Sequence, residues 1–491
     1  MADEGEPISK RLRRSESNYT TVEQSVESQS KSSDLMHSNP TSDDEEDEQA
    51  IDVDSLLVLN DYCLLKIFEL SSIESLCRLA NVCKHFKLLA QDVFSRRYSE
   101  IFIGSRFYRL LFRRVLIKFG HFIKKLILEE GVHLIPNDVN AIAMYCPKLE
   151  HFVAFRKTIS CNVLKSVFER LKHLEFVECQ FIGDTKTMFA ACAQLEKMHI
   201  DTNTEADMPK CNILNLKKLR FVADTNGKMA VLWQLLQQNP QIKELCVPSL
   251  VDNEIIANIV QHAKNVEVLD FWTNGRKTVL PRKQSCQGML KLAELKSLKK
   301  LRLFVASGRI ASALAEELTA KKQDIRNLLI WAHNFGRKHL PSILKLKTLQ
   351  ELDLMFNGEL TDTDLASISR ELPSLEILSL RFFPDARYNI PLDGLVNMIQ
   401  FGEKLCNVWL IGVRNMKIDQ ETFKSLVEAV EKRIRGSLMI SLQGCKTTMV
   451  LDVPQKIQQA NQSTLQIKYE GRYCSDKDGC EMCKEEKKAK R

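Results

Sequence analysis

The stretch LTDTDLASISRELPSLEILSL, from Leu360 to Leu380, contains every element of one structural unit. Apolar residues three and four apart predict a helix from Thr361 to Leu372. Pro373 follows at once, at a position where proline commonly stops a helix. An apolar-x-x-apolar-x-apolar pattern then begins at Leu375 and predicts a strand. The unit therefore consists of a helix, a proline stop and a strand.

This unit recurs along the chain. Pro147 and Pro240 also lie between a helical stretch and a strand, and further helices are expected at Asp138–Tyr145 and Asn253–Ala263. The twelve intervals of the strand pattern span 314 residues, and their mean of about 26 is typical of leucine-rich repeats. The thirteen copies lie at or near Leu126, Phe152, Leu171, Met198, Leu219, Leu245, Val266, Leu301, Leu328, Leu349, Leu378, Val408 and Ile440.

The repeats predict an α/β fold. One unit cannot bury its apolar face alone, so the units should stack into a curved solenoid with a parallel inner sheet and outer helices. We expect about 12–13 repeats over residues 121–465, preceded by a helical linker or cap at 99–120. Residues 466–491 are expected to form a charged, cysteine-containing tail.

The N-terminal segment, residues 1–52, has a different composition. It is rich in Ser and acidic residues, so it cannot bury enough apolar surface to offset the entropy of ordering, and we expect disorder. Its first 50 residues hold 5 Lys/Arg and 13 Asp/Glu, whereas the whole chain carries a net charge of +7, so the body is basic. Such a surface favours an acidic protein partner over nucleic acid. The basic cluster Lys10–Arg14 is either a solvated tail or a nuclear-import signal.

Residues 53–98 are expected to form a small all-α module. Apolar residues from Leu56 to Phe94 recur at helical spacing. Asn60 or Asp61 should cap a first helix, and Ser71 with Glu74 fits a capping box that opens a second. A bundle of this size buries little surface, so we expect it to dock on another surface.

The segment LNDYCLLKIFELSSIESLCRLANVCKHFKLLAQDVF, residues 59–94, resembles an F-box. The matching positions are Leu59, Ile67, Phe68, Leu76, Leu79, Val82, Cys83, Phe86, Leu89 and Phe94. The sequence departs from the family at Asn60, where Pro is usual, and at Phe94, where Trp is common. The resemblance implies binding of the Skp adaptor of a cullin-RING ubiquitin ligase through Leu59, Leu64, Ile67, Phe68, Leu76, Leu79, Val82 and Phe86. The unit at Leu360–Leu380 likewise resembles the leucine-rich repeats of F-box proteins.

A substrate-binding face is expected on the second half of the array. Side chains alternate along a strand, so residues directly before and after the last apolar position of each pattern should face the inner side. Trp and Arg are the residues most enriched at binding hot spots. The candidates, which include three of the four tryptophans, are Asp270, Trp272, Arg302, Phe304, Trp331, Asp353, Met355, Arg381 and Trp409. The alternative is that irregular repeats turn these rings into the core.

No catalytic motif is visible: the sequence has no Gly-rich phosphate loop and no His-Glu-x-x-His. We therefore expect a non-catalytic protein without cofactor or metal. Cys474, Cys480 and Cys483 include one C-x-x-C pair, but a closed zinc site needs four ligands and no fourth lies nearby in sequence. The first residues lack the apolar core of a secretory signal, and no run is long enough to cross a membrane, so a cytoplasmic or nuclear location is expected.

The resemblance implies a substrate receptor of an SCF (Skp-cullin-F-box) ubiquitin ligase, which joins the adaptor, and through it the cullin and RING subunits, to an unidentified substrate protein. A leucine-rich-repeat interaction scaffold without ligase function is the alternative. A third class, an RNA-processing repeat protein, would need strongly salt-dependent binding to nucleic acid.

Overall fold

A computed structural model describes residues 59–472 apart from 130–131, 133–134, 156–157, 161–166, 168, 170, 178–179, 183–186, 188–189, 193, 202–212, 223–228, 248–252, 272–286, 306, 333, 383–389, 414–415, 435 and 446–448. The chain divides into two compact units, Met1–Ser71 and Ser72–Arg491. The predictions for residues 1–52 and for Cys474, Cys480 and Cys483 lie outside the described residues.

The described part of the first unit holds one helix, α2 (Asp61–Glu69). Asn60 caps it, because its side-chain Oδ1 accepts a hydrogen bond from the backbone N–H of Cys63 at 2.9 Å. Leu64 and Phe68 lie one turn apart on the buried side of the helix, whereas Ile67 lies on its exposed side.

The second unit begins with helices α3 (Ile73–Leu79) and α4 (Lys84–Arg97). The cap of α3 is Ser72, whose Oγ accepts a hydrogen bond from the backbone N–H of Ser75 at 3.1 Å. The predicted capping box at Ser71 is therefore wrong by one residue. Glu74 forms an ion pair with Arg78 at 2.8 Å, one turn along the helix, instead of reaching back to a backbone N–H.

A parallel sheet of fifteen strands runs through the second unit, in the order β1-β2-β3-β5-β7-β8-β9-β10-β11-β12-β13-β14-β15-β17-β19. Its strands are β1 (Glu100–Ile103), β2 (Lys125–Leu128), β3 (His151–Phe155), β5 (His173–Val177), β7 (Lys197–Asp201), β8 (Lys218–Val222), β9 (Glu244–Cys246), β10 (Val268–Asp270), β11 (Lys300–Val305), β12 (Asn327–Ala332), β13 (Glu351–Phe356), β14 (Ile377–Phe382), β15 (Asn407–Val413), β17 (Leu438–Cys445) and β19 (Leu465–Arg472).

The register of this sheet explains the leucine repeat. Leu328 pairs with Leu352, Leu352 with Leu378, and Leu378 with Val408, so the same repeat position forms a continuous buried row. Full burial of each such side chain is worth about 1.5–3 kcal/mol. All thirteen copies of the predicted pattern contribute a strand to the sheet. The predicted leucine-rich-repeat solenoid is thus confirmed.

The sheet extends beyond the range predicted for it. Strand β1 lies within residues 99–120, which were expected to be helical, and β19 continues seven residues past position 465. Both are the terminal strands of the sheet, with one neighbour each among the described residues. Their sequences lack the full apolar pattern, because a terminal repeat packs against only one other repeat. Helices α5 (Ser105–Leu110) and α6 (Phe112–Phe119) occupy the rest of the predicted linker.

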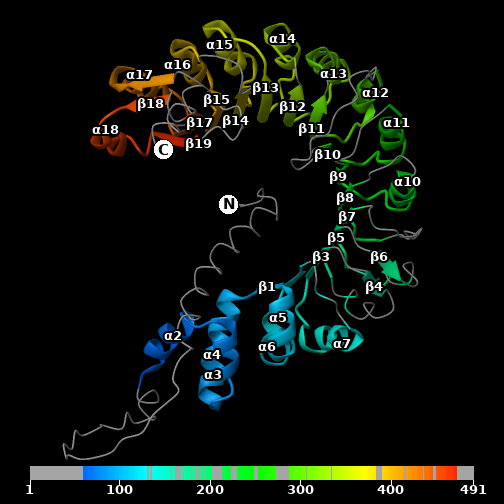
Figure 1. Ribbon diagram of the computed structural model, residues 1–491. Coiled ribbons are helices and arrows are strands. Elements are labelled where there is room, and N and C mark those ends of the chain that lie inside the picture. The colour runs from blue at the N-terminus through cyan, green and yellow to red at the C-terminus, as the bar shows by residue number, and fades with distance from the viewer. Residues whose placement is uncertain are drawn as a thin grey trace, which may run out of the picture. The chain divides into compact units, whose positions relative to one another are not determined.

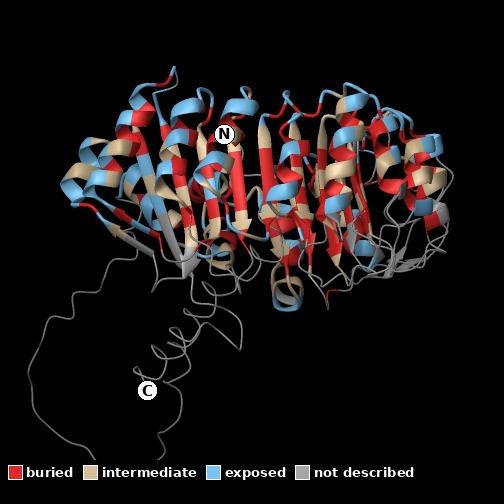
Figure 2. Cartoon of the chain, turned by 90° about the horizontal axis from the view of Figure 1, so that it is seen from above, coloured by how far each residue is buried: buried red, intermediate tan, exposed pale blue. Residues whose placement is uncertain are grey.

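Helices cover one side of the sheet in the second unit, and their buried residues lie on the side that faces it (Figures 1 and 2). In α17 (Gln420–Glu431), for example, Phe423, Leu426 and Val430 are buried at helical spacing. The other helices on this side are α7 (Pro136–Tyr145), α10 (Met229–Gln238), α11 (Asn253–His262), α12 (Gln287–Leu290), α13 (Gly308–Ala320), α14 (Leu340–Ile343), α15 (Asp362–Glu371) and α16 (Leu392–Phe401). The predicted proline stops are confirmed, since α7, α10 and α15 each end two residues before the proline.

Short elements complete the loops. The 3-10 turns are η2 (Gly120–Phe122), η4 (Lys291–Glu294) and η5 (Arg337–His339), and helix α18 (Gln455–Ala460) precedes β19. Two small parallel pairs join loops of different repeats: β4 (Thr158–Ser160) with β6 (Gln180–Ile182), and β16 (Met416–Asp419) with β18 (Met449–Asp452).

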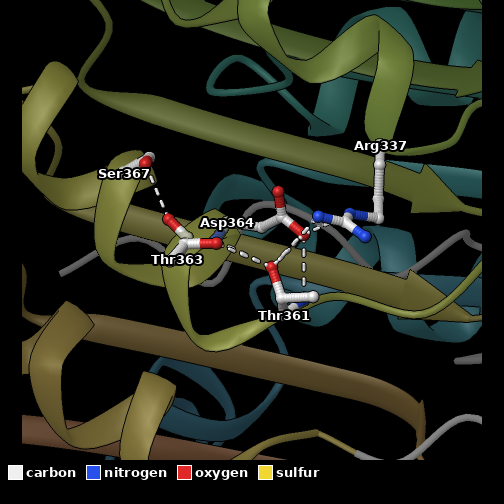
Figure 3. A network of polar contacts seen from close by, with 5 residues as sticks. All are labelled: Arg337, Thr361, Thr363, Asp364 and Ser367. Carbon is white, nitrogen blue, oxygen red and sulfur yellow. Dashed lines mark hydrogen bonds and ion pairs between the residues drawn. The ribbon is translucent and has the colours of Figure 1, made fainter.

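Polar contacts at the start of α15 tie two consecutive repeats together (Figure 3). Thr361 and Asp364 form a capping box, in which Asp364 Oδ2 accepts hydrogen bonds from the Thr361 backbone N–H at 2.9 Å and from its hydroxyl at 2.7 Å. Arg337, from the preceding repeat, reaches the same carboxylate, with Nε 2.7 Å from Oδ2. Ser367 donates to the backbone carbonyl of Thr363 within the first turns. The cap of one helix is thereby held by its neighbour.

The close packing of neighbouring repeats can be tested by a substitution at Gly394 in α16. A Cβ at this position would lie 2.6 Å from the Cα of Asp362 in α15, so the backbones must separate to admit a methyl group. We expect Gly394→Ala to lower the free energy of unfolding by about 1–3 kcal/mol in urea titrations. Gly436→Ala is the control, because nothing lies within 4 Å of its Cβ position, and it should change stability by no more than about 1 kcal/mol. Equal effects would contradict the packing described here.

Candidate functional site

The face of the large sheet opposite the helices, called the inner face here, carries the predicted binding residues. In β13 the leucines Leu352 and Leu354 are fully buried toward the helices, so the alternating residues Asp353 and Met355 point to the inner face. The register places equivalent residues of neighbouring repeats side by side: Met355 pairs with Trp331 on β12 and with Arg381 on β14.

Three of the predicted residues meet in one cluster. Asp353 accepts a hydrogen bond from Trp331 Nε1 at 3.2 Å, and Arg381 Nη2 donates to Asp353 Oδ2 at 2.9 Å. Arg381 Nε lies 2.9 and 3.0 Å from the two carboxylate oxygens. The Arg381 guanidinium also lies over the Trp331 ring, with its central carbon 4.7 Å from the ring centroid. We call these three residues the Trp-Asp-Arg cluster.

Within the cluster, the negative charge of Asp353 is compensated by the other two residues. The side chain of Asp353 is only 7% exposed, and removing a carboxylate from water is costly unless a cation and hydrogen-bond donors compensate it. Arg381 supplies the cation and a two-pronged contact, and Trp331 supplies a further donor and an aromatic face. Asp353 was predicted to be available on the inner face, but its neighbours cover it. Its role is to hold the Trp331 and Arg381 side chains in place.

Trp409 on β15 differs from Trp331, because its side chain is exposed. The residue is 38% exposed, which is high for a tryptophan in the middle of a sheet. Its neighbours in register are two serines, Ser379 on β14 and Ser441 on β17. Small neighbours leave the indole accessible. The alternative prediction, that such rings turn into the core, does not hold for Trp409.

The other substrate-binding candidates form one ion pair or are only partly described by the structure. Arg302 and Asp270 lie opposite each other on β11 and β10, and their side chains form an ion pair at 3.3 Å. Phe304 lies on β11, paired with Trp331, but its side chain is outside the described part of the structure. Trp272 lies outside the described residues altogether. The second half of the inner face thus brings Asp270 and Arg302 together, and separately Trp331, Asp353 and Arg381.

A histidine group on the first half of the inner face was missed in the sequence. His151 on β3 and His173 on β5 face each other with their Nδ1 atoms 3.2 Å apart. Beside them, Glu175 Oε1 lies 2.8 Å from Nδ1 of His199 on β7. The signal was present, because these residues occupy the same alternating positions as Asp353 and its neighbours. The sequence-based candidates all lie in the later repeats, so these histidines were not among them.

Burial sets the protonation of this group. Burial lowers the pKa of His173 to about 4, and it also lowers the pKa of His151. Burial alone would raise the pKa of Glu175, but the hydrogen bond with His199 and nearby positive charge outweigh it, so the pKa of Glu175 falls below its usual value. With both imidazoles neutral, one Nδ1 donates and the other accepts. If both Nδ1 atoms carried protons, their N–H groups would face each other and the contact would be lost.

The adaptor-binding candidates divide by exposure. Leu59, Ile67 and Val82 are 37%, 42% and 64% exposed, and Leu79 is half-buried. The remaining four, which are almost fully buried, are Leu64, Phe68, Leu76 and Phe86. Residues buried to this extent stabilise the fold, so a partner could reach only the exposed ones directly.

No other site chemistry is found in the described ranges. No group of three or more His, Cys, Asp or Glu among them has a metal-binding arrangement. Burial raises the pKa of the Cys77 thiol to about 11 and that of Cys246 to about 12, so neither is a ready thiolate nucleophile. Where the helices are described, none is long and apolar enough to span a membrane.

Comparison with solved structures gives distant likenesses. No model of a protein family and no curated protein matches the sequence. An internalin, InlF, from Listeria monocytogenes is similar at 12% identity and a TM-score of 0.36, over 69% of this chain and 89% of that one. TLR13 in its complex with ssRNA13 matches at 13% identity and 0.34, over 76% and 54%. Mouse RP105 in its complex with MD-1 matches at 14% and 0.35, over 71% and 72%.

The leucine-rich-repeat character of this chain therefore rests on its own geometry. Parallel strands recur in the second unit with their leucine positions in register, and helices cover one side of the sheet. Such a solenoid is a protein-interaction fold that presents a long sheet face.

We expect the stability of the protein to fall strongly when the ion pair of the Trp-Asp-Arg cluster is broken. Asp353→Ala leaves Arg381 without its carboxylate and Trp331 without its acceptor, and we expect a loss of about 3 kcal/mol in the free energy of unfolding. Asp324→Ala is the matched control, because Asp324 and Arg326 form an exposed pair at 2.9 Å that should contribute no more than about 1 kcal/mol. The free energy of unfolding of both variants is measured by urea titration. Similar losses in the two variants would show that the cluster does not stabilise the fold.

The histidine group predicts a loss of stability in mild acid. The unfolded chain binds a proton at His173 near pH 6.5, whereas the folded chain does so only near pH 4. Between these values the unfolded state holds more protons, so stability falls as the pH falls, by about 2 kcal/mol from pH 7 to pH 5 for this one group.

His173→Gln should remove most of this dependence, as measured by urea unfolding at each pH. His85→Gln, which changes an exposed histidine on α4, should retain the wild-type dependence. An unchanged pH profile in His173→Gln would show that another group is responsible.

Proposed function

We propose that the chain is the substrate-recognition subunit of an SCF ubiquitin ligase, with residues 59–94 as the adaptor-binding segment. The observation that carries this proposal is the F-box resemblance of that segment together with the exposure of Ile67 and Val82. Large apolar side chains at 42% and 64% exposure are unfavourable to leave in water, and a protein partner would cover them.

The helices of this segment are short and individually capped. Asn60 caps α2, Ser72 caps α3, and Cys83 caps α4 with its Sγ 3.4 Å from the backbone nitrogen of Phe86. Val82 follows α3 and directly precedes the cap of α4. Capped ends hold the turn between α3 and α4 in one conformation, and a preorganised contact residue loses less entropy when it binds.

In this proposal the solenoid holds a target protein on its inner face, and the adaptor links that target to the cullin and RING subunits. The chain supplies no reacting group. It raises the effective concentration of the target near a ubiquitin-charged enzyme, which promotes ubiquitination and later proteasomal degradation. The proposed location is the cytoplasm or the nucleus, where this machinery operates.

A leucine-rich-repeat scaffold without ligase function is the second candidate, and Phe94 favours it. This residue takes the place of the family's usual tryptophan, and it is fully buried in the second unit. Its ring stacks on Phe119 of α6, with centroids 4.4 Å apart. The last apolar residue of the motif is therefore used to pack α4 against the start of the solenoid, as a helical cap would require.

Binding to purified Skp adaptor separates the two functions. We expect Ile67→Ala combined with Val82→Ala to weaken binding at least tenfold in isothermal titration, because both removed side chains are exposed and apolar. Ile117→Ala is the matched control, since Ile117 is a 59% exposed isoleucine on α6 outside the F-box-like segment. It should bind the adaptor as the unmodified chain does.

The result is interpretable because the variants are at exposed positions and should keep the thermal stability of the parent chain. A parent chain that gives no heat with the adaptor would favour the scaffold. Equal weakening by the control would mean that the contact lies elsewhere on the helices.

A further inference from the structure

The inner face of strands β13, β14, β15 and β17 has an unusual composition for an exposed sheet surface. It holds several half-buried apolar residues and the exposed Trp409, which lies between Ser379 and Ser441 in register. We call this region the Trp409 patch: Met355, Ile377, Ser379, Trp409, Ile411, Met439 and Ser441.

Two charged residues that border the patch, Arg381 and Glu351, already have partners, whereas Lys468 on β19 lies beside Ser441 in register and is exposed. Arg381 is engaged by Asp353 through both Nε and Nη2 and lies over Trp331. Glu351 pairs with Lys300 at 3.5 Å and accepts a hydrogen bond from Asn327. Because Asp353 already compensates the charge of Arg381, an acidic or phosphorylated ligand would gain less from this residue than from an unpaired arginine. The seven residues of the patch itself are uncharged, so an uncharged anchor suits them best.

Ser379 adds a specific polar requirement. It lies between Leu378 and Leu380, whose side chains point into the core, so its own side chain points to the inner face. The residue is only 6% exposed, and its Oγ has no hydrogen-bond partner among the described residues. A buried hydroxyl without a partner is unfavourable. A group that hydrogen-bonds it beside the Trp409 ring would relieve this cost.

We propose that the Trp409 patch receives a short segment of the target protein that carries an uncharged apolar or aromatic anchor and one group that hydrogen-bonds Ser379. This inference rests on the proposed function only in that the solenoid binds a protein. The match is one of charge and polarity: a patch of uncharged side chains beside the paired Asp353 and Arg381 accepts a neutral segment without breaking that ion pair. Recognition at this patch needs no phosphate on the target.

The test uses the full chain and a phage-displayed library of random peptides as the probe. Enriched peptides are synthesised with a fluorophore, and their affinity is measured by anisotropy. We expect peptides with an apolar or aromatic anchor and no net charge, whose affinity changes less than about threefold between about 50 and about 500 mM salt. Trp409→Ala should weaken their binding at least tenfold.

Two further variants make the result specific. Phe401→Ala removes a 41% exposed aromatic ring from helix α16, on the helical side, and should leave affinity unchanged. Ser379→Ala should weaken binding severalfold without lowering thermal stability, because the free protein makes no hydrogen bond with this hydroxyl. A purely structural serine would show the opposite, lower stability with intact binding.

Several outcomes would overturn the inference. These are enrichment of acidic peptides, a marked gain in affinity when phosphoserine is placed beside the anchor, a steep salt dependence, and the absence of any peptide sensitive to Trp409→Ala. RNA that competes for the patch would also overturn it. Adaptor binding is measured on the same preparations: its loss with peptide binding intact refutes the ligase function alone, and the reverse refutes this inference alone.

Discussion

The structure depends on the alignment of the same apolar position in successive parallel strands. A single strand–helix unit of about 26 residues cannot enclose its own leucines, so each unit depends on its neighbours for stability. The row through Leu328, Leu352, Leu378 and Val408 is fully buried for this reason. Close contacts between helices, such as that of Gly394 with Asp362, and the shared cap at Asp364 strengthen the same neighbour-to-neighbour stacking.

Stacking also determines what the inner face can carry. Its side chains lie on strands about 4.8 Å apart, so a charged residue in one repeat is within reach of residues from adjacent repeats. In the second half this proximity joins Trp331, Asp353 and Arg381, and in the first half it joins His151 with His173. Two ion pairs on this surface, Asp270 with Arg302 and Asp353 with Arg381, are thus formed between neighbouring strands. Trp409 is a large uncharged side chain that remains accessible on this face, and the proposed recognition patch is built around it.

The short helices near residues 59–97 are determined mainly by local sequence, through their capping residues and apolar spacing. Side-chain caps begin α2, α3 and α4, and each helix has one apolar side. The apolar residues of the motif then separate into two groups, a buried one that includes Phe68 and Phe94 and an exposed one that includes Ile67 and Val82. Only the exposed group is available to a partner. The proposed contact of this segment with the adaptor therefore involves only a few side chains.

Periodicity in the sequence was sufficient to predict the α/β solenoid, the proline-ended helices and the face on which Asp353, Arg381 and Trp409 lie, because alternation along a strand is a local property of the backbone. It was not sufficient for the terminal strands β1 and β19, whose packing on one side only weakens the pattern. The pairing of side chains and their exposure required the folded chain. Asp353 and Arg381 are 28 residues apart, and only the pairing of β13 with β14 brings them together, while Trp331 on β12 helps to cover the carboxylate.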